Sequence, residues 1–385
     1  MKEGWEAKKL VDICKIQYGY PFDSKQFCDD SKYPQLIRIR DVSRGYSETY
    51  FSGEIPEGYY IDKGDYLIGM DGEFNIAAWN SERALLNQRV CKITANNEAF
   101  DRFLYYNLRI VLKQIEDETP FVTVKHLSAK RLNGVTINLP PLSEQKYIVN
   151  ELDLLSSIIE KKKAQIKELD NLAQSLFYEM FGDPITNDKG WEIKIFGEVV
   201  VSSQIGLIRS AKQQGQDKSF AYFKMNNITI SGDIDLTNLT RVDASEEEQA
   251  KFFLKQGDFL FNTRNSYELV GKSCVYNVKD NNTTLYNNNL LRILFNSTIT
   301  PIYISYLFKD KFIKKQLDSI KKGTTSVWAI YYKDLSKIKI LAPPLSIQQQ
   351  FTSKIEAIEY QKELIKQSIK EVETLFNSRM DYYFN

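Results

Sequence analysis

One order of motifs occurs twice along this chain, and that internal repeat constrains the fold more than any other feature. The clearest pair is Leu139–Gln145 (LPPLSEQ) and Ala342–Gln348 (APPLSIQ), which are offset by 203 residues. Matched starts at Trp5 and Trp191, and two further pairs, precede it in the same order: Lys63–Ile68 with Gln256–Phe261, and Leu86–Ile93 with Tyr286–Ile293. The offset drifts upward along the chain, as loop insertions between matched elements would cause. We therefore expect two copies of one module.

Within each copy, short β-rich segments are separated by Gly, Asn and Asp, and a helical stretch follows them. The expected strands are Gln35–Arg40, Asp65–Met70, Gln88–Thr94, Ala221–Met225, Phe259–Thr263 and Leu290–Phe295. The expected helical stretches are Phe100–Glu116 and Pro301–Lys321. This order of elements predicts an α+β class with two globular β-rich domains, each from one copy.

A long amphipathic helix is predicted after each Pro-Pro-Leu. Ser143 and Ser346 are the expected N-caps, and Gln349 completes a capping box in the second copy. Apolar residues then recur in alternating steps of four and three residues, with Lys162 and Lys362 each interrupting one seam. The seam residues are Ile148, Leu152, Leu155, Ile159, Ile166 and Leu169 in the first helix, and Ile355, Ile358, Ile365, Ile369 and Val372 in the second.

A strict heptad seam requires a helical partner, and the two seams match one another in length. The chain must cross a globular domain between the two helices, so we expect an antiparallel coiled coil and a pseudo-twofold repeat. The seam lysines would then fix the register or extend to solvent at the ends. Pairing of each helix with a different protein is the alternative. The expected divisions are 1–142, a first helix at 143–185, a second domain at 186–344 and a second helix at 345–385.

Composition places the chain among ordinary globular proteins, with 43% hydrophobic residues and a mean hydropathy of −0.39. No apolar run is long enough to cross a membrane, and the first residues resemble neither a secretory signal nor a transit peptide. Four cysteines lack metal-ligand spacing, so we expect a cytoplasmic protein without a metal site. Charge is uneven: residues 191–344 hold 21 Lys and Arg against 15 Asp and Glu, whereas residues 1–142 hold 19 against 20.

Motifs for catalysis are weak throughout the sequence. His126 is the only histidine, and no nucleophile motif accompanies it. Gly271-Lys272-Ser273 lacks the first glycine of a phosphate-binding loop, and Asn138–Leu142 has its proline pair out of register with an amino-methyltransferase tetrad. We therefore expect no catalytic residues and no cofactor in this chain.

Residue types that read DNA recur in both copies between the predicted strands. Arg and Lys contact phosphates and guanine, whereas Asn and Gln read adenine edges. The first copy offers Tyr20, Arg38, Arg40, Arg44, Gln88, Arg89, Thr123 and Lys125. The second copy offers Arg209, Lys224, Asn226, Asn227, Arg264, Asn265, Asn288, Thr324, Ser326 and Trp328. Because these residues occupy equivalent places in the two copies, we expect one face of each domain to contact double-stranded DNA.

The whole chain resembles the specificity subunits of type I restriction–modification systems. The resemblance is carried by the two tryptophan starts, Arg38–Val42, the Gly-Asp pairs at 64 and 257, Gly323-Thr324-Thr325 and above all the two Pro-Pro-Leu-Ser-x-Gln segments. It implies two target recognition domains, each reading one half of an asymmetric, interrupted DNA site. Thr119-Pro120-Phe121 replaces the Gly-Thr turn of the second copy, so this loop of the first domain is expected to differ.

The same resemblance implies partners for the two helices, which set the spacer between half-sites. Two modification (methyltransferase) subunits would dock on them and bring S-adenosylmethionine, and restriction subunits would add cleavage that uses ATP and Mg. The alternatives are a stand-alone DNA methyltransferase and a coiled-coil DNA scaffold without sequence preference.

Overall fold

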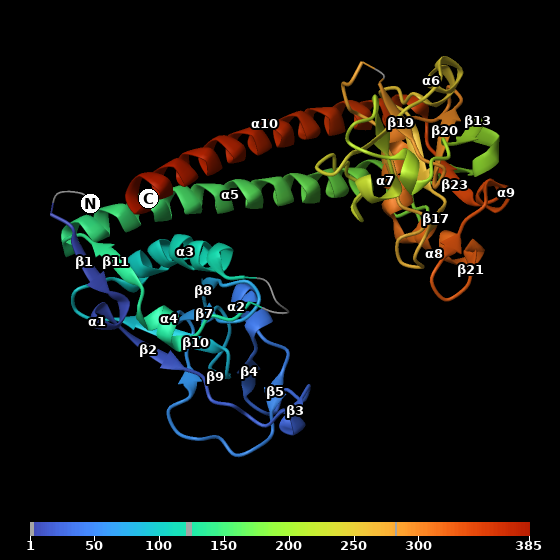
Figure 1. The fold of residues 1–385 in the computed structure, drawn as a ribbon. Coiled ribbons are helices and arrows are strands. Elements are labelled where there is room, and N and C mark those ends of the chain that lie inside the picture. The colour runs from blue at the N-terminus through green and yellow to red at the C-terminus, as the bar shows by residue number, and fades with distance from the viewer. Residues whose placement is uncertain (1–3, 121–124, 282) are drawn as a thin grey trace. The chain divides into compact units, whose positions relative to one another are not determined.

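The computed structural model describes residues 4–120, 125–281 and 283–385. The chain divides into two compact units, Met1–Lys163 with Lys366–Asn385, and Ala164–Ile365. Each unit holds one globular part together with a stretch of each long helix (Figure 1). Across the described residues, no helix combines the length and the apolar character needed to cross a lipid bilayer.

The globular part of the first unit is built on a four-stranded antiparallel sheet in the order β2-β10-β7-β8. A second sheet has the order β3-β5-β4-β9-β6, and β1 pairs with β11 beside the long helix. The strands are β1 (Glu6–Lys9), β2 (Cys14–Tyr18), β3 (Phe27–Cys28), β4 (Gln35–Ile37), β5 (Tyr50–Phe51), β6 (Tyr60–Ile61), β7 (Tyr66–Gly69), β8 (Ile76–Ala78), β9 (Ala84–Leu86), β10 (Val90–Ala95) and β11 (Thr136–Leu139). The helices are α1 (Leu10–Ile13), η1 (Ser24–Gln26), α2 (Ile39–Arg44), α3 (Asp101–Glu118) and α4 (Ala129–Asn133).

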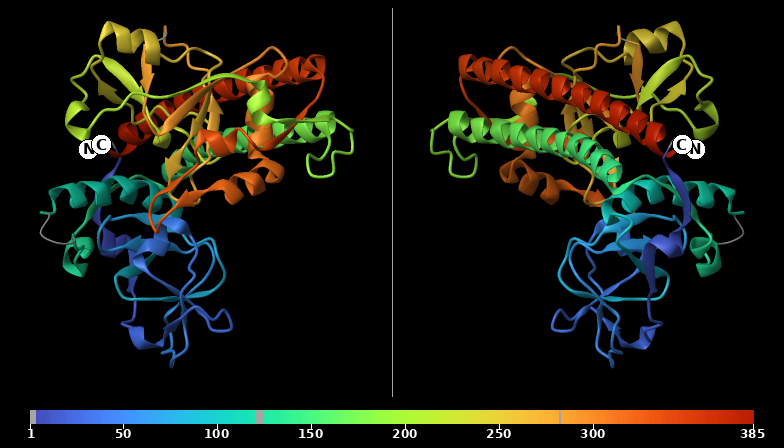
Figure 2. Two further views of the ribbon diagram at one scale, coloured as in Figure 1. Left: turned by 90° about the vertical axis from the view of Figure 1, so that its right-hand side faces the viewer. Right: turned by 90° about the vertical axis from the view of Figure 1, so that its left-hand side faces the viewer.

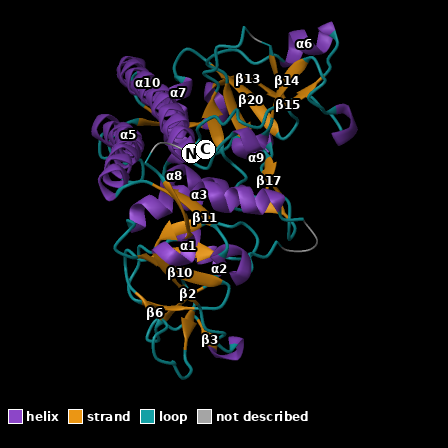
Figure 3. Cartoon of the chain, turned by 60° about the vertical axis from the view of Figure 1, so that its left-hand side comes forward, coloured by secondary structure: helices purple, strands orange, loops and turns teal. Residues whose placement is uncertain are grey.

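The second unit repeats this plan with the sheet order β13-β20-β16-β18. Its other sheets are β15-β14-β19, β17-β22-β21 and β12-β23 (Figure 3). The strands are β12 (Glu192–Ile195), β13 (Val200–Ile205), β14 (Phe220–Phe223), β15 (Thr240–Val242), β16 (Phe259–Asn262), β17 (Arg264–Asn265), β18 (Ser273–Val275), β19 (Thr284–Tyr286), β20 (Leu290–Phe295), β21 (Lys322–Gly323), β22 (Trp328–Ala329) and β23 (Lys339–Ala342). The helices are η2 (Phe196–Val199), η3 (Ala211–Gln213), η4 (Met225–Asn227), α6 (Glu246–Phe252), α7 (Pro301–Lys309), α8 (Lys311–Ile320) and α9 (Tyr332–Leu335).

The repeated Gly-Asp pairs close equivalent turns in front of β7 and β16. Gly64 and Gly257 have φ values of +96° and +92°, which glycine adopts without the steric cost of a side chain. Asp65 forms an ion pair with Lys92 on β10 at 2.7 Å, and Asp258 pairs with Arg292 on β20 at 3.6 Å. The motif therefore repeats because each copy ties a turn to its central strand.

The long helices are α5 (Leu142–Phe181) and α10 (Leu345–Phe384). Both begin one residue before the predicted capping serines, so the prediction that Ser143 and Ser346 are N-caps was wrong. Ser143 and Ser346 lie inside the first turn, and the carbonyls of Pro141 and Pro344 accept the first helical hydrogen bonds. The prolines leave no unused N–H of their own at this position, which suits the start of a helix.

Two fully buried glutamines fasten the starts of these helices to the globular parts. Gln145 accepts a hydrogen bond from the Phe100 backbone N–H at 3.0 Å and donates to the carbonyls of Glu98 and Pro140. Gln348 makes the same three contacts in the second unit, with the Thr300 N–H and the carbonyls of Thr298 and Pro343. The glutamine of each Pro-Pro-Leu-Ser-x-Gln segment is therefore a structural clamp.

Within each unit, α5 and α10 pack side by side and run antiparallel (Figures 1 and 2). In the first unit, Arg379 Nε lies 2.6 Å from Glu151 Oε1. In the second unit, the rings of Phe177 and Phe181 contact Phe351. The seam residues Ile148, Leu152, Leu155, Ile159, Ile355, Ile358 and Ile369 are buried, whereas Ile166, Leu169, Ile365 and Val372 are half-buried. The antiparallel pair therefore forms within the chain.

The two seam lysines lie in different environments. Lys362 is 4% exposed and its ammonium lies 2.6 Å from Asp170 on α5 and 3.0 Å from Glu359. This buried ion pair links the two helices inside the second unit and raises the pKa of Lys362. Lys162 is half-buried and forms no ion pair among the residues with described positions.

The strand expected at Ala221–Met225 ends at Phe223, because the Lys224 N–H donates to Asn227 and Met225 begins η4. Two further predicted elements differ from the structure. The strand expected at Gln35–Arg40 ends at Ile37, because Asp41 accepts a hydrogen bond from the Arg38 backbone N–H and begins α2. The helix expected at Pro301–Lys321 is broken, because the Asp310 side chain caps a new helix by accepting from the Phe312 N–H. Both breaks come from aspartates whose side chains compete for backbone donors.

Candidate nucleic-acid interface

A tight turn between β9 and β10 presents two of the predicted DNA-reading residues in the first unit. Gln88 and Arg89 are exposed, and Arg89 has a φ of +69°, a left-handed conformation that few non-glycine residues adopt. The turn is held by Gly19, whose backbone passes so close that a Cβ there would lie 2.0 Å from the Asn87 carbonyl oxygen. The Tyr20 carbonyl accepts from the Gln88 N–H. The position of both side chains is thus fixed by the backbone.

A second segment carries Arg38 at the N-cap of α2, directly after β4, and Arg40 in the first turn of α2. Asp41 is buried and accepts from the Arg38 N–H at 2.9 Å, which fixes the start of α2 and leaves both arginine side chains exposed. Arg44 is exposed in the last turn of the same short helix. The predicted Arg-x-Arg motif is therefore held by the aspartate that directly follows it.

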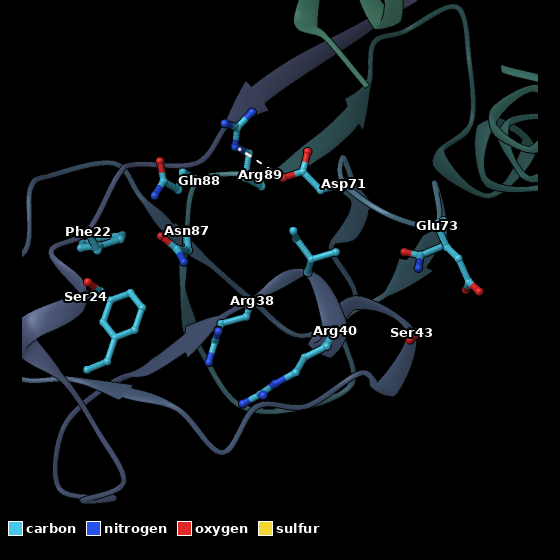
Figure 4. Close-up of a pocket in the computed structure, with 13 residues that line it drawn as sticks. Phe22, Ser24, Arg38, Arg40, Ser43, Asp71, Glu73, Asn87, Gln88 and Arg89 are labelled. Atoms are coloured by element: carbon cyan, nitrogen blue, oxygen red, sulfur yellow. Dashed lines mark ion pairs between the residues drawn. The ribbon is translucent and has the colours of Figure 1, made fainter. Parts of the chain in front are cut away.

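These two segments face one hollow of about 640 Å³ in the first unit (Figure 4). Arg38 and Arg40 lie on one side of it, with Asn87, Gln88 and Arg89 on another. Its lining residues are Phe22, Ser24, Phe27, Arg38, Ile39, Arg40, Ser43, Asp71, Glu73, Asn75, Asn87, Gln88 and Arg89. The structure thus brings together four residues that the sequence selected from separate loops.

Asp71 also lies in this hollow, although it is not among the predicted DNA-reading residues. Its carboxylate is 3.6 Å from Arg89 Nε, and its Oδ1 is hydrogen-bonded to His126 Nδ1 at 2.5 Å. Arg89 in turn approaches His126 Nε2 at 3.1 Å. An aspartate does not belong to the residue types that bind DNA, so Asp71 gave no sequence signal. Its role depends on which basic side chains it contacts in the fold.

Two other candidates of the first copy, Lys125 and Tyr20, are placed differently. Lys125 is half-buried, and its ammonium donates to the Glu116 carbonyl at 2.5 Å. Tyr20 is 37% exposed and packs against the rings of Phe22 and Tyr59. The prediction for Thr123 lies outside the described residues.

The second unit repeats the Arg38 loop with Lys224 and Asn226. The Lys224 N–H donates to Asn227 Oδ1 at 2.9 Å, just as the Arg38 N–H donates to Asp41. Asn226 is exposed, whereas Asn227 is 2% exposed and donates to the Asp235 carbonyl. The loop therefore presents Asn226 to solvent, whereas the half-buried Lys224 donates its ammonium to Gln214 Oε1 at 3.1 Å and Asn227 supports the backbone.

Lys272 holds the backbone of the loop that carries Lys224 and Asn226. Its ammonium donates to the Met225 and Ile228 carbonyls, and burial lowers the pKa of Lys272. The Gly271-Lys272-Ser273 motif thus holds backbone carbonyls in this structure.

The turn between β19 and β20 matches the turn that carries Gln88. The Leu207 N–H donates to the Tyr286 carbonyl, as the Tyr20 N–H does to Leu86, and Asn288 is half-buried at the position of Gln88. A Cβ on Gly206 would lie 2.3 Å from the Tyr286 oxygen, so Gly206 repeats the close approach of Gly19. The glycine repeat was missed because its neighbours differ: Tyr18 and Tyr20 in one copy, Ile205 and Leu207 in the other.

The three-stranded sheet β17-β22-β21, with the turn between β21 and β22, carries five further candidates of the second unit: Arg264, Asn265, Thr324, Ser326 and Trp328. Arg264 pairs with Ala329, and Asn265 pairs with Trp328. Arg264, Thr324 and Ser326 are exposed, and Trp328 is half-buried with its ring 4.9 Å from that of Tyr267.

Arg209, the last candidate of the second unit, contacts Glu248 and Asp243 instead of that sheet. Its guanidinium pairs with Glu248 at 2.6 Å and donates to the Asp243 carbonyl, and its side chain is 14% exposed. Much of its donor capacity is therefore used inside the domain.

Comparisons with known proteins fit this arrangement. Residues 2–171 and 188–374 match the family model of the type I restriction modification DNA specificity domain. The chain is 38% identical over 195 residues to the type I restriction enzyme EcoBI specificity subunit of Escherichia coli, a match that spans 50% of this chain and 41% of that protein. It is 20% identical over 383 residues to the EcoKI specificity subunit of Escherichia coli strain K12, spanning 93% of this chain and 82% of that protein.

Solved structures share the fold. The type I restriction–modification S subunit from M. genitalium superposes with a TM-score of 0.56 at 14% identity, covering 98% of this chain and 95% of that chain. A chain from a study of complex assembly and conformational transition of the type I R-M system gives a TM-score of 0.54 at 19% identity, covering 100% and 98%. The family model matches both copies of the repeat, and the chain therefore belongs to the family of type I restriction modification DNA specificity domains.

Proposed function

We propose that this chain is a DNA specificity subunit in which each globular part reads one half of a bipartite site. One observation carries the proposal: the two copies display matching polar positions on the same backbone frame. Arg38 corresponds to Lys224, and the N–H of each donates to the side chain three residues on. Gln88 corresponds to Asn288, and matching backbone hydrogen bonds flank the two turns that carry them. The frame is shared and the side chains differ, so the two parts are suited to different bases.

The proposal extends to partners. α5 and α10 would set the distance between the half-sites and dock two modification subunits, with restriction subunits joining the assembly. S-adenosylmethionine would be held by the modification subunits, and ATP and Mg by the restriction subunits. The chain itself would perform no catalysis. The names of the relatives, which are specificity subunits of type I restriction enzymes, support a role for this chain in recognition.

Selection from a randomised DNA pool tests the reading function. The full chain, alone and with its modification subunits, should enrich two short defined sequences separated by an undefined spacer of constant length. Salt-sensitive binding without any enriched sequence would favour a DNA scaffold without sequence preference. Methyl transfer by the chain alone, measured with labelled S-adenosylmethionine, would favour a stand-alone methyltransferase.

A further inference from the structure

One short segment carries the whole basic excess of the second copy. Residues 191–344 hold 21 Lys and Arg against 15 Asp and Glu, and residues 311–339 alone contribute eight lysines and two aspartates. The rest of residues 191–344 is therefore balanced, at 13 against 13. Such a concentration of one sign creates a local potential that net charge alone does not reveal.

The segment folds into adjoining elements at one end of the second unit (Figure 1). Gln316 on α8 donates to the Lys339 carbonyl at 3.0 Å and accepts from the Lys339 N–H at 2.8 Å, so α8 is joined to β23. A hollow of about 190 Å³ lies between α8 and α9, lined by residues that include Gln316, Asp334 and Lys337. The lysines therefore lie on elements that adjoin one another.

Most of these lysines point to solvent. In α8, Ile313 and Leu317 are buried, whereas Lys311, Lys314 and Lys315 are exposed on the other side. Lys322, Lys333, Lys337 and Lys339 are also exposed. We call these seven exposed residues the lysine surface.

Neutralisation within this surface is slight. Among the described residues, Lys322 alone of the seven has an ion-pair partner, Asp334 at 2.6 Å. The hydrogen bond from Lys322, and then the nearby charges of Lys333 and Lys337, lower the pKa of Asp334. One carboxylate thus serves three lysines, and a net positive charge remains.

The lysine surface borders the sheet that carries Arg264. Lys322 on β21 pairs with Ala329 on β22, which pairs in turn with Arg264 on β17. Lys321 anchors this border: its ammonium donates to the Tyr267 carbonyl at 2.6 Å and lies 4.2 Å from the centre of the Tyr267 ring. A ligand that contacts Arg264 therefore passes next to Lys322, at the edge of the lysine surface.

Among the residues that the structure describes, the first copy has no equivalent group of exposed lysines. At the 203-residue offset, Leu108, Val111 and Leu112 of α3 stand where the second copy has Lys311, Lys314 and Lys315. Leu108 and Leu112 are buried, and α3 ends in the acidic run Glu116–Glu118. The basic surface is thus a property of the second domain alone.

We propose that the lysine surface binds the phosphate backbone of DNA next to the second half-site, and that the first domain makes no equivalent contact. This inference rests on the proposed function, because it assumes that the β17-β22-β21 sheet faces DNA. Lysine ammonium groups neutralise phosphates and release counterions without reading sequence. The second domain would therefore contribute more of the salt-sensitive affinity than the first.

Binding of the full chain to a duplex that holds its selected site, measured by fluorescence anisotropy at several KCl concentrations, tests this. The variant K311Q/K314Q/K315Q keeps the aliphatic stems and removes three charges. We expect weaker binding and a slope of log K against log salt that is shallower by about 0.9 per lost contact, with unchanged half-site preference. A charge-retaining K311R/K314R/K315R variant should keep the slope. The control K167Q/K366Q/K370Q removes three exposed lysines from α5 and α10 and should match the unaltered protein.

Neutral methylphosphonate linkages locate the contact. Placed beside the second half-site, they should reduce the slope for the unaltered protein and leave it unchanged for the triple glutamine variant. Placed beside the first half-site, they should affect both proteins equally. An unchanged slope of log K against log salt for the triple glutamine variant would overturn the inference. Normal DNA binding by that variant together with lost assembly with partner subunits would also overturn it, and would assign the surface to an acidic protein. Absence of any preferred site for the unaltered protein would instead overturn the proposed function.

Discussion

Asp71 and Arg264 occupy the same position in the two copies of the fold and carry opposite charges. The residue before each of them donates its backbone N–H to a carbonyl of the neighbouring turn. Met70 donates to the Arg89 carbonyl, and Thr263 donates to the Asn289 carbonyl. Each also lies in a backbone bridge across to the matching loop, Asp71 with His126 and Arg264 with Ala329. The shared frame thus places an acceptor in one domain where the other has a donor.

Replacement of Asp71 should disturb the first half-site only. D71N keeps the shape and removes the charge that holds Arg89 and His126, so the Arg89 side chain loses its fixed position. We expect about tenfold weaker binding to the first half-site, as for loss of a hydrogen bond to a charged group. Competition among duplexes that vary in one half-site measures this. E73Q is the control, because Glu73 lines the same hollow without an ion pair among the described residues. Equal effects of the two variants would contradict the role given to Asp71.

Replacement of Arg264 should have the complementary effect. Its guanidinium is exposed, and a bidentate base contact is worth roughly 1–3 kcal/mol of discrimination. R264A should therefore relax preference at one position of the second half-site and leave the first half-site unchanged. The same competition assay applies, with K279A as an exposed control on another loop. Uniform loss of affinity without loss of preference would assign Arg264 to a phosphate instead.

Removal of either buried glutamine clamp should destabilise the unit that contains it. Q145M leaves the Phe100 N–H and the carbonyls of Glu98 and Pro140 without their partner, and Q348M does the same in the second unit. Each change should cost about 1–3 kcal/mol, the desolvation penalty of buried polar groups. Denaturant titration measures the unfolding free energy. Q349M changes an exposed glutamine in the same helical turn, so it should unfold at the original midpoint.

Stability of the first unit should fall in acid partly through Glu151. The hydrogen bond from Arg379, followed by that from Tyr383, lowers the pKa of Glu151. Since the folded-state pKa is depressed, the contribution is present above the unfolded-state pKa of glutamate and is lost as pH falls through the folded-state value. E151Q should therefore show a flatter decline of unfolding free energy between about pH 5 and about pH 3. E356Q, at an exposed position of α10, should keep the original decline.

Lengthening both long helices should lengthen the spacer. Seven residues that continue the heptad pattern, inserted at matched points of α5 and α10, add about 10 Å, or about three base pairs of DNA. Pool selection should return the same two half-sites with a longer gap. Seven residues inserted in the turn at 186–190 serve as the control and should leave the gap unchanged. An unaltered gap after the helix insertion would show that the helices do not set it.

Much of this architecture could be predicted from the sequence. The heptad period indicated two long helices, and the ordered repeat indicated two similar α+β domains, because both signals are local in the chain. Helix starts were less accurate: Ser143 and Ser346 look like caps, yet proline carbonyls perform that role. The DNA-facing candidates Arg38, Arg40, Gln88 and Arg89 were found by residue type, and their roles remain predictions.

What only the tertiary structure decided is which side chains are available and which are already used. Arg209 and Asn227 match the residue types that read DNA, yet their hydrogen bonds go to their own domain, whereas Asp71 joins Arg89 from the segment that follows β7. The sequence determined the repeat, the helices and the charge of each segment, because these depend on order and composition along the chain. Side-chain partnerships depend on contacts between residues far apart in sequence, and only the packed fold brings them together.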